Sequence, residues 1–273
     1  MDPLTIAIIV AVFTLIVLFS GIPIAFGLSF VSITLLVTFE GLQMLGVFAE
    51  TFYAGLNSFV LLSIPMFILM GMAVAHSPAG KDLYTGLDRW LWRVPGGLVI
   101  SNIGACSIFA ALSGSSPATC AAIGTMGIPE MRKRGYSDEI ATGTIAAGGT
   151  LGVLIPPSIV LIVYGMATGT SIGRLFLSGI IPGFMLASLF AVWALIHSYF
   201  IDKNASKLLR NRKPPTLKEK FEVLPRIFPF LAIIVGVLYV LYGGVATPSE
   251  ASGVGAFLVF VMIAVVYKIY QPK

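Results

Sequence analysis

Two polar, helix-breaking stretches inside apolar segments carry the chemistry that this sequence offers. The first is Ser-Gly-Ser-Ser-Pro at 113–117, halfway along the apolar run 94–131. The second is Ile-Pro-Pro-Ser at 155–158. At membrane depth, such residues are tolerated only where they are buried in protein or line a cavity. Their presence predicts a site that holds an ion or a small solute.

The two adjacent prolines predict a broken span over 138–169. Pro156 and Pro157 lack backbone donors and clash with the preceding turn, and the residue before each leaves helical geometry. We therefore expect free carbonyls between Gly149 and Pro156, and a second half-helix that begins near Pro157 with proline in its first turn. Free carbonyls suit a hard cation such as Na⁺, and a half-helix N-terminus suits an anion. A plain proline kink is the alternative.

At 113–117 and just beyond, hydroxyls and exposed backbone provide the polar groups. Ser113, Ser115, Ser116 and Thr119 could contact an ion or a solute, or they could simply let helices pack closely. No acidic residue lies convincingly inside a span, because Glu250 fits a capping box that begins at Thr247. The lack of intramembrane carboxylates favours Na⁺ over H⁺ as a coupling ion. No zinc, nucleophile-elbow or phosphate-loop motif occurs, so we expect no enzyme activity.

The composition is that of an integral membrane protein. Of the 273 residues, 57% are hydrophobic and 11% are charged. Apolar runs are long enough to cross the hydrocarbon layer repeatedly, which predicts an all-α, multi-pass protein in the lipid bilayer. The predicted spans are 4–20, 23–39, 55–76, 138–169, 175–200, 227–243 and 249–267. The segment 94–131, between the third and fourth of these, is predicted to be a re-entrant hairpin.

Basic residues predict the topology. All but one of the 17 Lys and Arg residues fall in 77–93, 132–134, 202–226 and 268–273. The positive-inside rule places these groups in the cytoplasm and the N-terminus outside, with 40–54 also outside. Because the net charge of +5 reflects this rule, we expect no nucleic-acid partner. Both ends of 94–131 then face the cytoplasm, so this segment enters the membrane and returns. A single long span would put its flanking basic groups on opposite sides. No removable signal peptide is expected.

Two connectors are amphipathic. Leu83, Leu87 and Trp90 lie on one side of 80–93, which is typical of a helix at the membrane interface. The stretch 203–224 resembles a second surface arm. An ordinary basic cytoplasmic loop is the alternative.

An inverted repeat is predicted from two similar span pairs. The spans of 4–39 and those of 227–267 are each joined by a Gly/Pro turn, and the predicted path gives the pairs opposite orientations. Inverted repeats are typical of secondary transporters, with the solute held where the repeats meet. We expect 227–273 to hold only the first two spans of an incomplete second repeat.

Four separated motifs, spread along the chain, resemble the large membrane subunit of TRAP transporters of the dicarboxylate-permease type. They are Ser-Gly-Ser-Ser-Pro-Ala-Thr at 113–119, Pro-Glu-Met-Arg-Lys-Arg-Gly-Tyr at 129–136, Gly-Gly-Thr-Leu-Gly-Val-Leu-Ile-Pro-Pro-Ser at 148–158 and Gly-Ile-Ile-Pro-Gly at 179–183. The resemblance implies a bacterial inner-membrane, Na⁺-driven importer of an organic acid with an elevator mechanism. It also implies two partners, a periplasmic substrate-binding protein and a small four-span membrane subunit.

The resemblance also implies roles for particular residues and segments. Scaffold spans and an arm helix would occupy 1–93, the transport domain 94–200, and a basic cytoplasmic arm 201–226. The implied Na⁺ ligands are Ser115, Ser116, Gly149, Gly152, Val153 and Pro156, and the implied solute-binding residues are Ser113, Ser115, Ser116, Thr119, Thr150 and Ser158.

Family members complete the site with a second hairpin and a second broken span, which this sequence lacks. Two alternatives therefore stay open. One is a non-transporting membrane scaffold, and the other is an elevator-type anion carrier that works without a binding protein.

Overall fold

The described part of the chain is helical throughout. The structure, a computed structural model, describes residues 2–94, 96–197, 199 and 215–268, and these contain helices and no strand. Three helical stretches among them are long and apolar enough to span a membrane, namely Asp138–Thr168, Ile172–Ile196 and Pro248–Tyr267. The all-α membrane class predicted from the composition is therefore confirmed. The chain divides into two compact units, Met1–Ser58 and Phe59–Lys273.

The first unit begins with a helical hairpin. Helices α1 (Pro3–Phe19) and α2 (Ile24–Glu40) are joined by a turn in which Gly21 has a φ of 80°. These helices confirm the predicted spans to within a residue. Then follow the 3₁₀ helix η1 (Leu42–Met44) and α3 (Leu45–Leu56). The predicted connection 40–54 is thus mostly helical.

The second unit holds both predicted breaks. It begins with η2 (Phe59–Leu62), α4 (Ser63–Ala75) and α5 (Ala79–Trp90). The central elements are α6 (Gly97–Ser113), α7 (Ser116–Lys133), α8 (Asp138–Leu154), α9 (Ile159–Thr168) and α10 (Ile172–Ile196). The last are α12 (Leu217–Glu222), α13 (Leu224–Tyr242) and α14 (Pro248–Tyr267).

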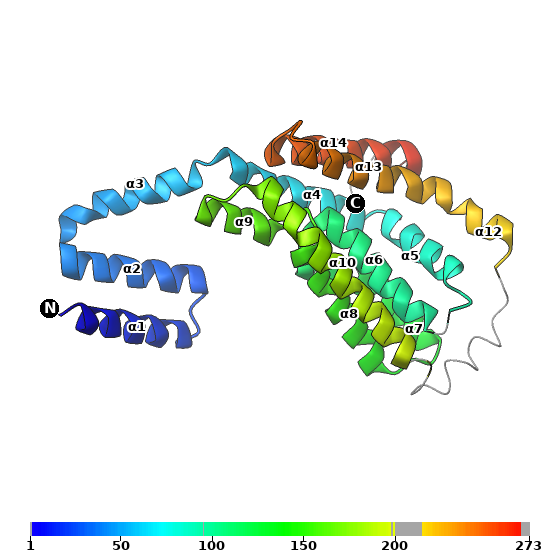
Figure 1. Cartoon of the computed structure of the whole chain (residues 1–273), viewed down its shortest axis with the longest axis horizontal. Helices are drawn as coiled ribbons and strands as arrows, with labels where there is room; N and C mark the ends of the chain where they lie inside the picture. The colour runs from blue at the N-terminus through cyan, green and yellow to red at the C-terminus, as the bar shows by residue number, and fades with distance from the viewer. Residues whose placement is uncertain (1, 95, 198, 200–214, 269–273) are drawn as a thin grey trace. The chain divides into compact units, whose positions relative to one another are not determined.

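Close helix packing holds the second unit together. Helices α6, α7, α8 and α10 run together as a bundle, α4 packs along α14 and against α6, and α13 packs against α14 and α5 (Figure 1). Because lipid tails are as apolar as leucine, such packing depends on close approach through small residues. On α8, Gly148 lies against the sulfur of Cys106 in α6, and the next residue, Gly149, lies against Cys120 in α7. Both cysteines are free thiols.

Side chains cap the starts of α8 and α14, and the second cap is the one that the sequence predicts. The side chain of Ser137 caps α8, and Arg132 binds Asp138 at 2.6 Å beside it. At α14, the backbone N–H of Thr247 donates to Glu250 Oε2 at 2.8 Å, which is half of a complete capping box. Glu250 therefore stabilises a helix start, as expected from its sequence context.

The predicted interfacial arm 80–93 forms α5, but most of its apolar side packs against protein. Leu83 and Tyr84 are buried, and Gly86 lies against Ile227 of α13. Trp90, at the end of α5, stays 49% exposed. That this arm anchors at the membrane interface stays a prediction, and it now concerns only the exposed C-terminal end of α5. Of the predicted basic arm 201–226, residues 201–214 lie outside the described part of the chain.

The second predicted span pair is also observed as two helices. Helices α13 and α14 are joined by a short turn, 243–247, in which Gly244 has a φ of 65°. The inverted relation between this pair and α1–α2 stays a prediction, as does the division into scaffold and transport domains.

Candidate functional site

The tip of the 94–131 segment is a tight turn between two helices of nearly equal length. Helix α6 has 17 residues and α7 has 18. Gly114 closes α6 with a φ of 59°, a left-handed conformation that glycine adopts without a steric penalty. Ser115 then caps α7, because its Oγ accepts a hydrogen bond from the N–H of Ala118 at 3.5 Å. The sequence from Ser113 to Pro117 thus reverses the chain within two residues.

Hydroxyl groups at this tip form a small buried network. The Oγ of Ser113 and the Oγ1 of Thr119 are 3.0 Å apart, and Thr119 also donates to the carbonyl of Ser115 at 2.8 Å. Ser113 and Thr119 are both almost completely buried. The Oγ of Ser116 is buried as well, but it has no hydrogen-bond partner among the described residues. A buried hydroxyl without a partner is costly, so this oxygen is a candidate ligand.

The second break separates α8 from α9. Helix α8 continues to Leu154, and α9 begins at Ile159 with Ser158 as its N-cap, whose Oγ accepts from Leu161 N at 3.4 Å. The second half-helix therefore begins near Pro157 and Ser158 as predicted, but the prediction that proline lies in its first turn is wrong, because Ser158 is the N-cap and Pro157 precedes it.

The unwound stretch is shorter than predicted. A proline removes the donor for the carbonyl four residues earlier, so Pro156 and Pro157 free the carbonyls of Gly152 and Val153 and leave those before them bonded. Gly149 consequently lies inside regular helix. The prediction that free carbonyls begin at Gly149 is wrong. This glycine instead allows close packing, since an added Cβ would overlap the sulfur of Cys120.

The two breaks are in direct contact. The N–H of Ile159 donates to the carbonyl of Gly114 at 3.0 Å, which joins the start of α9 to the hairpin tip. On α8, a Cβ added to Gly152 would lie 2.8 Å from the backbone nitrogen of Ser116. Two helix C-termini and two helix N-termini therefore converge at one place. Carbonyls at the former favour cations, and N–H groups at the latter favour anions.

Two further helices border this junction. The Cα of Gly71 on α4 lies so close to Ser113 that an added Cβ would be 2.7 Å from that residue's Cα. On α10, Gly179 lies equally close to the carbonyl of Leu154, and Gly183 lies against Ile155. The small residues of the predicted 179–183 motif thus allow α10 to cover the break. Gly71 has no distinguishing pattern around it, and sequence reasoning missed it.

The structure therefore brings most of the proposed site residues together, but gives them different environments. Those of the tip contact those of the break directly. Ser158 is buried and its hydroxyl caps α9. Thr150 is exposed, and its hydroxyl donates to the carbonyl of Ala147 at 2.6 Å. Successive helical residues are turned by about 100°, so Thr150 cannot share the face of Gly149 and Gly152 that packs against the hairpin.

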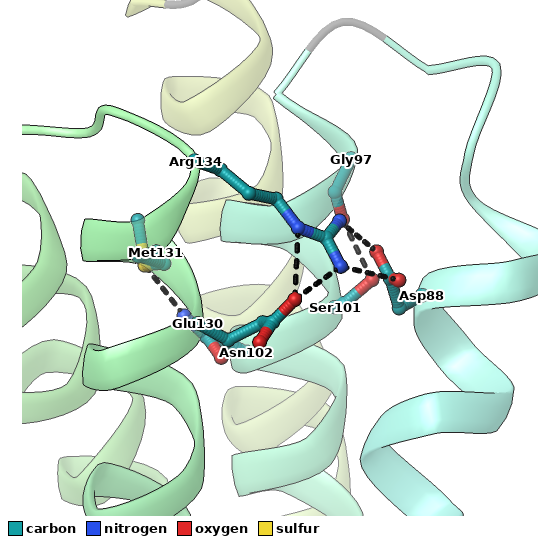
Figure 2. A network of polar contacts seen from close by, with 7 residues as sticks. All are labelled: Asp88, Gly97, Ser101, Asn102, Glu130, Met131 and Arg134. Atoms are coloured by element: carbon teal, nitrogen blue, oxygen red, sulfur yellow. Dashed lines mark hydrogen bonds and ion pairs between the residues drawn. The ribbon is translucent and has the colours of Figure 1, made fainter. Parts of the chain in front are cut away.

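The base of the hairpin holds an ion-pair network that sequence reasoning missed. Arg134, just after α7, binds both carboxylate oxygens of Asp88 on α5, at 3.0 and 3.1 Å (Figure 2). The same guanidinium donates to Glu130 at 2.6 Å. Burial alone would lower the pKa of Arg134, but hydrogen bonds and charge attraction from Asp88, and then from Glu130, raise it. The network ties α5 to the end of the hairpin.

An amide in the same view links the two arms of the hairpin. Asn102 of α6 is fully buried, and its Nδ2 donates to the sulfur of Met131 on α7 at 2.7 Å (Figure 2). Its Oδ1 lies against Gly127 and has no hydrogen-bond partner among the described residues.

The described residues form helices only, and a helical hairpin packs on a broken, proline-interrupted helix, an arrangement that is common in membrane transport proteins. Comparison with known families agrees. Residues 9–272 match the family described as "Tripartite ATP-independent periplasmic transporter, DctM component". The chain belongs to this family, that of the TRAP transporter large permeases, and it is therefore not an enzyme.

Individual relatives support the assignment. The chain is 38% identical over 254 residues to the C4-dicarboxylate TRAP transporter large permease protein DctM of Vibrio cholerae, covering 92% of this chain and 54% of that protein. It is 32% identical to the sialic acid TRAP transporter large permease protein SiaM of the same organism, covering 92% and 57%. It is 36% identical to the isethionate TRAP transporter permease protein DctMQ of Oleidesulfovibrio alaskensis, covering 87% and 36%. The chain thus spans about half the length of the large permeases that it matches.

Proposed function

We propose that this chain is part of a Na⁺-coupled TRAP permease that imports a small organic acid across the bacterial inner membrane. The single observation that carries the proposal is the contact between the hairpin tip and the broken helix. There, the hydroxyl of Ser116 has no hydrogen-bond partner among the described residues, and Pro156 and Pro157 cannot supply the intrahelical donors for the carbonyls of Gly152 and Val153. Hydroxyl and carbonyl oxygens are the ligands that hard cations prefer. These residues therefore fit a Na⁺ ion.

The solute would bind beside this ion. The N-termini of α7 and α9 meet at the junction, and N–H groups at helix starts favour anions. Relatives are named for C4-dicarboxylate, sialic acid, isethionate and ectoine. All four compounds carry a carboxylate or a sulfonate, so we propose an anionic group as the shared feature of the solute. Thr150, on another face of α8, would contact it only from the exposed side of that helix.

The family also implies the partners. A periplasmic binding protein would deliver the solute, and a small membrane subunit would brace the permease. In the elevator mechanism that we propose, the hairpin and the broken span move together. The hydrogen bond between Ile159 and Gly114 supports this, because it joins the two elements into one body.

Replacing Ser116 by alanine tests the ion site. In a complete transporter that contains this chain, the Na⁺ concentration for half-maximal uptake should rise by roughly tenfold, since a bond to a charged group contributes about 1.5 kcal/mol or more. The matched control is Ser107→Ala on α6, whose hydroxyl already donates to the carbonyl of Ile103 at 2.8 Å. If uptake by the Ser116→Ala variant depends on the Na⁺ concentration as uptake by the unaltered protein does, Ser116 is excluded as a ligand of the ion.

The re-entrant path of the hairpin is tested separately. In a variant without native cysteines, Lys133→Cys should react with a membrane-impermeant maleimide only from the cytoplasmic side. Lys133 is suited to this because its side chain is 75% exposed at the end of α7. A cysteine at Thr51, in the segment predicted to face the periplasm, should react only from the opposite side. Labelling of position 133 from the periplasm would contradict the proposed topology.

Two other functions are separated by simple comparisons. A non-transporting scaffold would bind the small subunit but show no uptake with any solute in reconstituted vesicles. A carrier that works alone would transport equally well with and without the binding protein.

A further inference from the structure

Exposed aromatic rings gather where the end of α5 meets α12. The rings of Trp90 and Phe221 pack edge to face with centroids 5.9 Å apart. They nevertheless stay 49% and 55% exposed. Arg89 on α5 donates to the backbone carbonyl of Glu219 on α12 at 2.6 Å, so the two helices are held together here.

Basic groups lie directly on these rings. The Nζ of Lys220 is 5.8 Å from the centroid of Trp90 and 6.0 Å from that of Trp92. The guanidinium of Arg93 is 5.2 Å from the Trp92 ring. A cation–π contact uses one side of each cation and leaves the other side accessible. We call Trp90, Trp92, Arg93, Lys220 and Phe221 the α5–α12 cluster.

Nearby carboxylates offset only part of the positive charge of the cluster. Neither Arg93 nor Lys220 forms a salt bridge within the described residues. Glu219 is held in a capping box, where its Oε2 accepts from the N–H of Thr216 at 2.8 Å. The hydrogen bonds from the backbone and side chain of Thr216 lower the pKa of Glu219, so this carboxylate stays ionised while it is held at the start of α12. Glu222 is the remaining carboxylate of α12. Over residues 89–93 and 217–222 together, the basic residues Arg89, Arg93, Lys218 and Lys220 outnumber the acids Glu219 and Glu222.

Exposed apolar side chains flank the cluster along the chain. Leu217 is 75% exposed, and Phe228, one turn into the apolar helix α13, is 68% exposed. Cations, aromatic rings and exposed apolar side chains thus lie within one short stretch of the chain, from Leu217 to Phe228, and at the end of α5. Tryptophan is enriched at the headgroup level of membranes, and basic residues there attract anionic lipids.

We propose that the α5–α12 cluster binds the phosphate of an anionic phospholipid of the surrounding bilayer. Arg93 and Lys220 contact the phosphate, Trp90 and Phe221 lie at the level of the glycerol, and an acyl chain follows α13. This lipid holds the exposed end of α5 at the membrane surface, although the rest of that helix packs on protein. The proposal requires only that the chain spans a membrane, and it does not depend on the ion or solute site.

Tryptophan quenching by brominated lipid tests the site. The full chain carries Trp193→Phe, so that Trp90 and Trp92 alone report, and it is placed in nanodiscs with brominated phosphatidylglycerol or brominated phosphatidylcholine at equal mole fractions. Phosphatidylglycerol should quench more strongly. Arg93→Gln and Lys220→Gln should each weaken the preference by about fivefold, whereas Arg93→Lys and Lys220→Arg should keep it.

Lys133→Gln is the matched control, because it removes an exposed basic group that lies on no aromatic ring. This variant should keep the full preference. Equal quenching by both lipids, or an equal loss in Lys133→Gln, would overturn the proposal. Relief of quenching by soluble glycerol phosphate would also overturn it, since the site would then bind free phosphate. Circular dichroism checks that the Gln variants retain their helices, and loss of lipid preference with full helicity supports the site.

Discussion

Replacing Gly152 by alanine should separate the hairpin tip from the broken helix and remove most transport. The new Cβ would lie 2.8 Å from the backbone carbon of Ser115 and from the nitrogen of Ser116. Both atoms belong to a tight turn and cannot move as a flexible side chain could. Overpacking of this kind costs about 1–3 kcal/mol. The free energy of unfolding should fall by this amount in mixed micelles with increasing SDS, and Na⁺-dependent uptake should fall with it.

Gly143 provides the matched control on the same helix. An added Cβ there has no atom within 4 Å. Gly143→Ala should therefore leave uptake unchanged and raise stability by up to about 1 kcal/mol through helix propensity. The comparison separates the contact at position 152 from any general effect of alanine in α8. Equal behaviour of the two variants would argue against a direct contact between the breaks.

Asp88→Asn should have the second large effect, at the base of the hairpin. The Asp88 side chain is only 8% exposed, and that of Arg134 is 26% exposed. Removing one partner of a buried pair leaves an uncompensated charge and costs about 3–5 kcal/mol, which partial exposure and the remaining bond to Glu130 reduce to about 2–3 kcal/mol. The same SDS titration measures this loss.

The double variant Asp88→Asn with Arg134→Gln should recover part of the stability, because no unpaired charge then stays buried. Arg132→Gln is the control, since its pair with Asp138 joins side chains that are 56% and 67% exposed. Pairs of this kind contribute at most about 1 kcal/mol. A loss in Arg132→Gln as large as that in Asp88→Asn would show that burial does not determine the effect.

The contact at Gly152 and the ion pair of Asp88 with Arg134 have different consequences for the elevator movement that we propose. The contact between Gly152 and the tip joins the hairpin to the broken span, so these two elements would move as one body. The bond between Asp88 and Arg134 instead joins the hairpin to α5, which we predict to be part of the scaffold. If the hairpin moves relative to α5, this ion pair must break or α5 must follow. Asp88→Asn would then change the rate of uptake as well as stability.

Much of the fold could be predicted because membrane helices are specified locally. Apolar length predicts α1, α2, α10, α13 and α14 to within a few residues, and Gly114 with Pro117 predicts the turn of the hairpin. The capping of α8 and α14 was equally local, since Ser137 and Thr247 each bind groups within three residues. The prediction was less accurate at the break between α8 and α9. A proline frees the carbonyl four residues before it, so the free carbonyls begin at Gly152 and not at Gly149.

The sequence by itself determined that this is an all-helical membrane chain of the TRAP large permease family, with polar breaks at 113–117 and 155–158, because helix length, turns and motifs depend on neighbouring residues. Tertiary structure alone decided that these breaks touch, that Gly149 and Gly152 provide space, and that Asp88 pairs with Arg134. Such contacts join residues tens of positions apart. Without a hydrophobic driving force between helices in lipid, they depend on shape and buried polar pairing, which no local pattern encodes.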